Sequence, residues 1–492
     1  MNILRKKTIE QSIAETEGKH QLKKVLGPWA LISFGIGCII GTGIFVLTGI
    51  AAHDKAGPAL ILSFVLAGIV TIISALCYAE FASMVPVAGS TYSYSYITLG
   101  ELFAWIIGWD LILEYTVAAA AVAHGWSHYL QNLLALFKIN FPSFLSKAPF
   151  DLDINTGQMI FTGSYFDLLS VLIITTLSII LIRGMKESSK LNNIMVIVKL
   201  AIILLVIFVG AFYIDFNNYF PFAPFGYGGI SIFGKTIWGS VDGAGQPVGV
   251  IAGAAIAFFA YIGFDAVSTS AEETKNPARD LPFGIIGSLL ISTILYIAVT
   301  AVLTGMVKYN QIDLDAPIAK AFEAHGLHGI QFIIDIGALT GITSVILVLL
   351  IGQTRIFFAM SRDGLLPKKL FSEVHPKFKT PYKSTILTGL IVSILAGFIP
   401  LRILSELVNI GTLLAFVIIS VAIIVLRYKL PNIHRPFKVP FGITLPILGV
   451  LFNLILMFSL PVDNWLRLFV WLAIGLIIYF LYGRNHSILN KQ

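Results

Sequence analysis

The sequence predicts an all-α protein that crosses a membrane many times. Of its 492 residues, 57% are hydrophobic and only 12% are charged, and the mean hydropathy is +0.87. Soluble domains carry roughly 25% charged residues, so this composition argues against a soluble enzyme. The apolar residues also gather in blocks of about 20, the length that a helix needs to cross a hydrocarbon core about 30 Å thick.

Twelve apolar segments qualify as candidate membrane spans. The first 26 residues are polar and basic and have no apolar core, so a cleavable signal peptide is not expected there. We expect tails over 1–28 and 484–492, with one transmembrane domain over 29–483. The spans lie near residues 29–51, 59–82, 102–128, 165–183, 191–214, 247–271, 282–306, 331–358, 384–400, 405–427, 441–460 and 464–482.

The distribution of Lys and Arg predicts the orientation of the chain. With the N-terminus inside, the inner tails and loops hold 24 basic residues and the outer loops hold eight, while Lys199 lies within a span. Inner loops of membrane proteins are enriched in Lys and Arg, so both termini are expected in the cytoplasm, with the protein in the plasma membrane. The same bias explains the net charge of +7 without a nucleic-acid partner.

Glycines interrupt two of the expected spans, the first and the sixth. Span 1 contains GIGCIIGTGIF, with Gly41, Thr42 and Gly43 in succession, and span 6 contains FFAYIGFDAVS, with Gly263 close to Asp265. Unwound backbone frees N–H and C=O groups that hydrocarbon cannot satisfy, so a break is tolerated where it lines a polar cavity. Two facing breaks, five spans apart as in inverted repeats, would suit a zwitterion. The alternative is that the glycines only permit close helix packing.

Three longer motifs resemble those of the amino acid–polyamine–organocation transporters. They are GIGCIIGTGIFVLTG in span 1, FFAYIGFDAVSTSAEETKNPARDLP in span 6 and GQTRIFFAMSRDGLLP at the end of span 8. The sequence is most similar to the cationic amino acid transporter group and its bacterial relatives, over essentially all spans. The resemblance implies a LeuT-type fold of two inverted five-helix repeats, about 29–214 and 247–427, with helices 1 and 6 broken. Two further C-terminal helices would occupy about 441–482.

The resemblance also implies a substrate site between the two breaks. The N–H groups around Gly41, Thr42 and Gly43 would hold a substrate carboxylate. Phe259 occupies the position of a large aromatic gate, although core packing is the alternative in a chain with 36 phenylalanines. We expect Ile342 of span 8 to line the end of the site that receives the substrate side chain. The carbonyls expected to accept from the α-ammonium are those of Ile39, Phe259, Ala260 and Ile262.

Lys199 lies about eight residues, or roughly 12 Å, into span 5. A charge so deep costs about 2.5–3.5 kcal/mol on insertion scales, which makes it a functional candidate. By resemblance to proton-coupled members of the superfamily, its ammonium would bind carbonyls at the span 1 break. Burial disfavours the charged form, so the same group would release a proton during transport. The alternative is a static ammonium that pins span 1 to span 5.

Other polar residues within the spans are expected to support the structure. Asp110 and Glu114, four residues apart in span 3, are interpreted as hydrogen-bonding to neighbouring helices, and Glu114 also resembles an acid of the cationic group. Asp265 is expected to stabilise the N-terminus of the second half of span 6. His124 is interpreted as a satisfied core histidine, and the two cysteines, Cys38 and Cys77, as small buried hydrophobes.

Charged residues near the inner ends of the spans allow two interpretations. They are either solvated topology signals or ion pairs of an inner gate. The residues concerned are Glu80, Arg279, Arg355, Arg362 and Asp363.

Together these features predict a secondary active transporter that works by alternating access. The expected cargo is a small neutral or broad range of L-amino acids moved with H⁺, since no acid in spans 1, 6 and 8 clearly faces the site. The alternatives are a carrier of cationic amino acids and an amino acid or polyamine exchanger. An intramembrane enzyme would need a catalytic residue set, which this sequence lacks. A channel would favour symmetric rings of polar residues around its pore. No cofactor or metal is expected; the partners are the substrate, H⁺ and the lipid bilayer.

Overall fold

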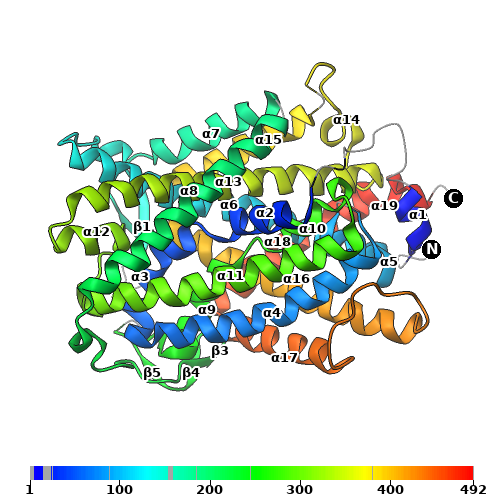
Figure 1. Ribbon diagram of the computed structural model, residues 1–492. Helices are drawn as coiled ribbons and strands as arrows, with labels where there is room; N and C mark the ends of the chain where they lie inside the picture. Colours follow the sequence, from blue (N-terminus) through cyan, green and yellow to red (C-terminus); the bar gives the residue numbers. More distant parts are fainter. Residues whose placement is uncertain are drawn as a thin grey trace.

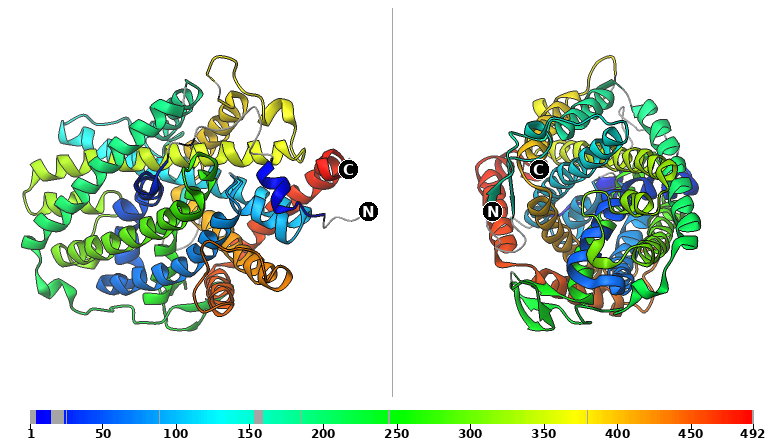
Figure 2. Two further views of the ribbon diagram at one scale, coloured as in Figure 1. Left: turned by 45° about the vertical axis from the view of Figure 1, so that its right-hand side comes forward. Right: turned by 90° about the vertical axis from the view of Figure 1, so that its left-hand side faces the viewer.

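Long helices that run side by side make up most of the molecule (Figure 1). The computed structural model describes residues 5–14, 24, 26–87, 89–152, 159–183, 185–243, 245–378 and 380–490. Half of the tail expected over 1–28, and the last two residues of the tail over 484–492, lie outside the described residues. Both termini lie at the same end of the helical bundle, and its end-on view shows the helices packed around a filled centre (Figures 1 and 2).

The helices follow the apolar segments of the sequence closely. In the first half they are α1 (Ile9–Ala14), α2 (Pro28–Ile39), α3 (Thr48–Ala51), α4 (Leu60–Met84), α5 (Ser90–Thr98), α6 (Glu101–Leu136), α7 (Leu168–Arg183) and α8 (Met185–Gly210). In the second half they are α9 (Val250–Ala257), α10 (Ala266–Thr269), α11 (Pro277–Met306), α12 (Pro317–Ala324), α13 (His328–Arg362), α14 (Lys368–Phe371), α15 (Tyr382–Phe398), α16 (Leu401–Lys429), α17 (Thr444–Ser459), α18 (Val462–Ile478) and α19 (Arg484–His486).

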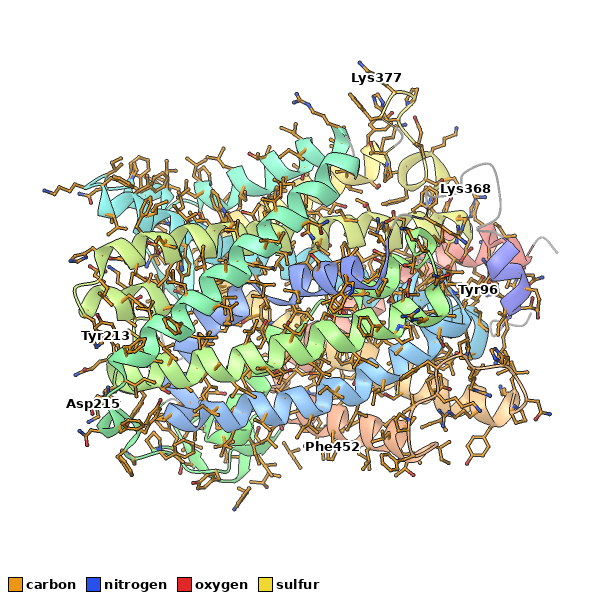
Figure 3. All side chains as sticks on the ribbon, viewed as in Figure 1. Tyr96, Tyr213, Asp215, Lys368, Lys377 and Phe452 are labelled. Carbon is orange, nitrogen blue, oxygen red and sulfur yellow. The ribbon has the colours of Figure 1, made fainter. Side chains whose placement is uncertain are left out.

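The helical content and hydropathy of the described residues support a polytopic membrane protein. Eight helical stretches are long and apolar enough to cross a membrane, and four shorter apolar helices, α2, α7, α15 and α17, accompany them. The end of the bundle with both termini also carries Lys368 and Lys377, whereas Tyr213 and Asp215 lie at the other end (Figure 3). This separation agrees with the charge asymmetry of the sequence, which places basic loops beside the termini.

The break predicted in the first span is present. Helix α2 ends at Ile39, and Ile40 is extended, with φ −82° and ψ 105°. Helical structure resumes in a π-helical segment, η1 (Gly43–Leu47), and continues through α3 into a second one, η2 (Ala52–Ala56). A short 3₁₀ turn, η3 (Gly57–Ala59), then leads into α4.

The break predicted in the sixth span is present too. Helix α9 passes into a 3₁₀ turn, η7 (Phe258–Tyr261), after which Ile262 is extended. Gly263 has φ +104°, a backbone conformation that side-chain-bearing residues rarely adopt, and this glycine therefore permits the sharp change of direction. Helix α10 begins three residues later.

The structure also contains short β-hairpins, which the all-α prediction did not include. The strands are β1 (Phe150–Leu152), β2 (Met159–Phe161), β3 (Ile230–Ile232), β4 (Lys235–Trp238), β5 (Ser240–Val241) and β6 (Pro247–Val248). They pair as three antiparallel two-stranded sheets, β1 with β2, β3 with β4 and β5 with β6. Strands β1 to β5 lie in the loops expected between spans 3 and 4 and between spans 5 and 6, and β6 lies at the start of the segment expected as span 6. Turn-forming residues in these loops make such pairing possible.

Tryptophans attach α18 to α6. The Nε1–H groups of Trp109 and Trp471 each donate to the other residue's carbonyl oxygen at 2.9 Å, and the two rings stack with centroids 4.6 Å apart. Gly475 leaves room for this arrangement, because a Cβ there would lie 2.6 Å from Cγ of Trp109.

Gly475→Ala is therefore expected to separate α18 from α6 and to destabilise the protein by about 1–3 kcal/mol. Thermal unfolding of the detergent-purified protein measures this as a lower melting temperature. Gly329→Ala is the matched control, since a Cβ at Gly329 meets no atom within 4 Å. An unchanged melting temperature for Gly475→Ala would show that α18 is not held by this contact.

Candidate substrate and coupling site

The two helix breaks lie against each other. A Cβ built on Gly43 would lie 2.6 Å from Cα of Ala260, so the backbones of the two breaks approach as closely as glycine allows. Gly263 packs in the same way on the side chain of Cys38. Gly41 lies against Val345 of α13. The breaks in spans 1 and 6 thus form one buried crossing point, as the resemblance predicted.

Backbone donors occur at the first break. Gly41, Thr42 and Gly43 lie at the start of the second half-helix, whose first N–H groups have no partner within the helix. The Gly41 carbonyl, by contrast, accepts from the N–H groups of Ile44 at 3.1 Å and Phe45 at 3.2 Å. Adjacent N–H groups at the start of a half-helix form an electropositive end that fits a carboxylate.

Some of the carbonyls expected to accept from a substrate ammonium already accept hydrogen bonds from the protein. Tyr296 of α11 places its hydroxyl oxygen 2.7 Å from the carbonyl oxygens of both Ile39 and Ala260. A phenol carries one proton, so it can satisfy one of these two acceptors fully at any moment. The Phe259 carbonyl accepts from the N–H of Ile262 at 3.2 Å. Tyr296 was missed at the sequence level because nothing in α11 marks this tyrosine.

Lys199 of α8 reaches the first break, as predicted. Its fully buried ammonium donates to the carbonyls of Gly37 at 3.0 Å and Ile40 at 2.8 Å, and to the hydroxyl of Ser344 at 2.9 Å. The three N–H bonds of a charged lysine are thus all used. Ser344 of α13 was not singled out in the sequence, although it completes the contact between spans 1, 5 and 8.

A cavity of about 340 Å³ extends from Phe259 towards the loops that carry the hairpins. Its wall includes Val46, Ile256, Phe259 and Asn409. Phe259 is buried, with 6% of its surface exposed, and the glycines of the first break do not line this cavity. Phe259 therefore lies between the cavity and the crossing point, where a gate would act. Ile342 is fully buried and is not part of the cavity wall.

The expected hydrogen bonds of the span 3 acids are absent. Asp110 and Glu114 are buried in α6, and none of their carboxyl oxygens has a hydrogen-bond partner among the described residues. Neither acid forms a well-defined hydrogen bond to a neighbouring helix, although the Thr412 side chain of α16 lies next to Glu114. Asp265 immediately precedes α10 but makes no side-chain cap; one of its carboxyl oxygens accepts from the Tyr115 hydroxyl at 2.6 Å instead.

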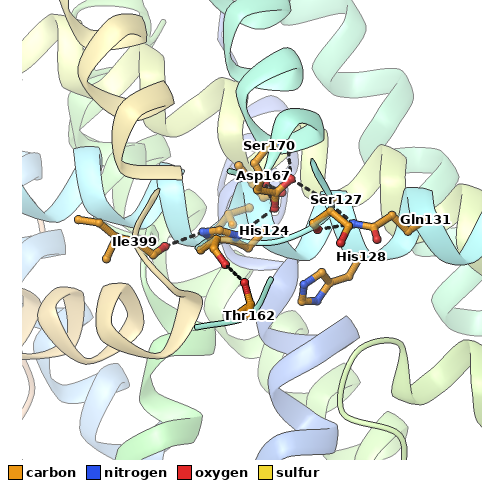
Figure 4. Close-up of polar contacts among 12 residues, drawn as sticks. His124, Ser127, His128, Gln131, Thr162, Asp167, Ser170 and Ile399 are labelled. Atoms are coloured by element: carbon orange, nitrogen blue, oxygen red, sulfur yellow. Dashed lines mark hydrogen bonds and ion pairs between the residues drawn. The ribbon is translucent and has the colours of Figure 1, made fainter. Parts of the chain in front are cut away.

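His124 is a satisfied core histidine, as interpreted (Figure 4). Its Nδ1 lies 3.0 Å from a carboxyl oxygen of Asp167, and its Nε2 lies 2.8 Å from the Ile399 carbonyl. Asp167 also accepts from the hydroxyls of Ser127 and Ser170, each at 2.7 Å. The cluster joins α6 to the start of α7 and the end of α15. Both cysteines are free and buried, as expected.

Ion pairs connect the ends of the helices on the side of the termini. Arg355 of α13 binds Glu273 at 2.8 Å and the Ser270 hydroxyl at 3.2 Å, both just after α10. Asp363 accepts from the N-terminal Lys7 and from the Tyr92 hydroxyl. These pairs link spans 6 and 8 and the N-terminal segment, as an inner gate requires. Glu80 of α4 makes separate contacts, accepting from the guanidinium of Arg427, from the Val439 N–H at 2.7 Å and pairing with Arg435 at 3.3 Å.

Comparison with known proteins finds similarity over the whole chain. A family model described as amino acid permease matches residues 26–481. The chain is 49% identical over 490 residues to the methylthioribose transporter of Bacillus subtilis (strain 168), covering 100% of both chains. It is 49% identical over 491 residues to the branched-chain amino acid permease BcaP of that organism, covering 100% of this chain and 99% of the other. It is 32% identical over 611 residues to the vacuolar cationic amino acid transporter 4 of Arabidopsis thaliana, covering 100% and 97% respectively.

Proposed function

The chain belongs to the amino acid permease family, and from this membership we propose that it carries small or branched neutral L-amino acids together with a proton. The protein is a multi-pass membrane transporter, which sets aside the intramembrane enzyme and the channel considered from sequence. Within the family, the choice of substrate and the coupling to H⁺ depend on the site at the crossing point of the two breaks.

The N–H groups of Gly41, Thr42 and Gly43, placed at the start of the half-helix where helices leave N–H groups without an internal partner, are the observation that carries the proposal. In hydrocarbon each unsatisfied group costs free energy, so a site that keeps such groups together is suited to a ligand that accepts hydrogen bonds. The carboxylate of an amino acid supplies such acceptors and a negative charge at a half-helix N-terminus. The α-ammonium would then lie at the carbonyls of Ile39 and Ala260.

Proton coupling is assigned to Lys199. Its ammonium supports the carbonyls of Gly37 and Ile40 where α2 ends, so its loss of a proton would remove a hydrogen bond from the first break. A neutral amine keeps two N–H donors for the three oxygen atoms that now surround it. The protonation of Lys199 would thereby bias the geometry of the carboxylate site. Glu114 of α6 and Asp265, just before α10, are proposed as supporting residues because both are buried.

Two other substrate classes follow from the relatives. A sugar thioether such as methylthioribose has no carboxylate for the three N–H groups, so the site favours an amino acid. A cationic side chain would need acids near Phe259, where the wall consists of residues such as Val46 and Ile256. The acidic residues of the wall, Asp54, Asp151 and Asp315, come from the segments near the hairpin-bearing end.

The finer architecture is also a proposal. We infer twelve membrane spans, with inverted repeats at about 29–214 and 247–427 and two additional helices at about 441–482. The transmembrane domain would cover 29–483, with both termini in the cytoplasm and the protein in the plasma membrane. The helix breaks in spans 1 and 6 and the common position of the termini support this arrangement.

Uptake by proteoliposomes tests the function. Radiolabelled leucine, alanine, arginine and methylthioribose are offered with and without an inward proton gradient, in sodium-free buffer. The expected result is accumulation of leucine or alanine that the gradient increases. Arginine uptake that does not depend on the proton gradient would favour the cationic carrier or exchanger. Uptake of methylthioribose and of none of the amino acids would contradict the proposal that the protein carries amino acids.

The inner ion pairs predict a shift between conformations. Arg355→Ala removes the link between α13 and the segment after α10, which is worth roughly 1 kcal/mol for a partly exposed pair, or about 5-fold in a two-state equilibrium. In a Cys77→Ala background, labelling of Cys38 by an impermeant thiol reagent from the cytoplasmic side should accelerate by about that factor. Lys383→Ala, which breaks the exposed pair with Glu373, should leave the rate unchanged. Equal rates in both variants would argue against an inner gate at Arg355.

A further inference from the structure

One face of α16 carries a polar stripe along the wall of the cavity. Arg402, Ser405 and Asn409 are spaced three and four residues apart, so they share one side of the helix, and all three line the cavity. The stripe runs from the start of α16 at Leu401 inwards. Ser405 is satisfied within the helix, because its hydroxyl donates to the Arg402 carbonyl at 2.9 Å. Asn409 is the innermost of the three along the helix.

Asn409 holds a buried acceptor that has no partner. The residue is 6% exposed, and its Oδ1 has no hydrogen-bond partner among the described residues. Its Nδ2 donates to the Ala255 carbonyl of α9 at 3.4 Å, a long contact. This contact also fixes the orientation of the amide, because the reverse orientation would bring two oxygen atoms together. A buried acceptor without a donor costs about 1–3 kcal/mol.

The surroundings of Asn409 define what can bind there. The facing wall is contributed by Ala252, Ala255 and Ile256 of α9, with Phe259 one turn further along. These side chains offer no donor to Oδ1. An occupant that satisfies the amide must therefore carry an N–H or O–H group and place it among apolar neighbours.

We propose that Asn409 is a specificity-determining residue: it accepts a hydrogen bond from a hydroxyl or amine on the side chain of a substrate held in the cavity on the outer side of Phe259, before that substrate reaches the crossing point. The inference rests on the proposed amino acid transport and adds a preference within it. Substrates with a side-chain donor gain a hydrogen bond at Asn409, whereas purely aliphatic ones leave the acceptor unpaired.

Threonine and valine provide the test, because they have nearly the same shape and differ by one hydroxyl in place of a methyl group. Their binding to the purified wild-type protein, to Asn409→Leu and to Asn409→Ala is measured by isothermal titration. The ratio of the threonine and valine dissociation constants cancels general effects of each substitution on the site. A net hydrogen bond of about 0.5–1.5 kcal/mol predicts that both variants lower the relative affinity for threonine by about 2–13-fold.

Asn453→Leu is the matched control. Asn453 of α17 is also buried with an unpartnered Oδ1, but it binds Ser74 and Gly449 and does not line the cavity, so its variant should keep the wild-type ratio. A ratio that stays at the wild-type value in the Asn409 variants would overturn the inference. Failure of the wild-type protein to bind either amino acid would instead overturn the proposed function.

The wild-type protein also permits a test without any substitution. O-methylthreonine lacks the hydroxyl proton and should bind more weakly than threonine by a similar factor. Equal binding of threonine and O-methylthreonine would contradict hydrogen-bond donation to Asn409.

Discussion

Gly43→Val should weaken substrate binding by about 100-fold or more, equivalent to roughly 2.7 kcal/mol. The reason is steric, because even a Cβ at this position would lie 2.6 Å from Cα of Ala260, and backbone atoms cannot yield as a flexible side chain can. The branched side chain would push the two breaks apart and tilt the N–H groups of Thr42 and Gly43. Binding of leucine to the purified variant, measured by isothermal titration, checks the expectation.

Insertion of the Gly43→Val variant into the membrane should remain intact. Valine is favourable in a membrane span, so the first span would still be recognised. Expression level and a monodisperse elution profile verify this. Gly27→Ala is the control, since a Cβ at Gly27 meets no atom within 4 Å, and it should bind normally. Wild-type affinity in Gly43→Val would show that the glycines of span 1 only permit close helix packing.

Lys199→Ala should reduce proton-driven uptake by about 100-fold. The substitution leaves the carbonyls of Gly37 and Ile40 without their donor in the membrane interior, at a cost of about 1–3 kcal/mol for each unpaired group. It also removes the ammonium that contacts the first break and that is proposed to exchange a proton there. Uptake into proteoliposomes is measured across a range of external pH in sodium-free buffer.

The pH dependence distinguishes coupling from a purely structural ammonium at Lys199. Residual uptake by Lys199→Ala is expected to be insensitive to the proton gradient. Lys320→Ala serves as the control, because Lys320 forms an exposed pair with Glu323 and should leave the response to pH intact. Full gradient-dependent uptake by Lys199→Ala would exclude the coupling role.

The two breaks and Lys199 could be predicted because they violate local rules. Gly41, Gly43 and Gly263 weaken helices where a membrane demands them, and Lys199 puts a charge where apolar residues surround it. Each violation is visible within a short stretch of sequence. In the structure, helix stops at Ile39 and resumes at Gly43 in the first span, and it stops at Tyr261 and resumes at Ala266 in the sixth.

The partners of these groups could not be predicted, because they come from distant parts of the chain. Tyr296 and Ser344 are ordinary residues in apolar helices, and only the packing of α11 and α13 brings them to the first break. For Asp110 and Glu114, by contrast, hydrogen-bond partners were expected that the structure does not show. Burial of a carboxyl group suggests hydrogen-bond partners, yet neither carboxyl group forms a well-defined hydrogen bond among the described residues.

The single proton of Tyr296 has a consequence for the contact between the two broken helices. Its hydroxyl faces one carbonyl from each broken helix, so two acceptors compete for one donor. The tyrosine can therefore satisfy the carbonyl of one break fully at a time. A substrate ammonium at the proposed site would bring three further N–H donors, so that both carbonyls could be satisfied together. Both breaks would then be held at once, and the proposed substrate would stiffen the contact between them.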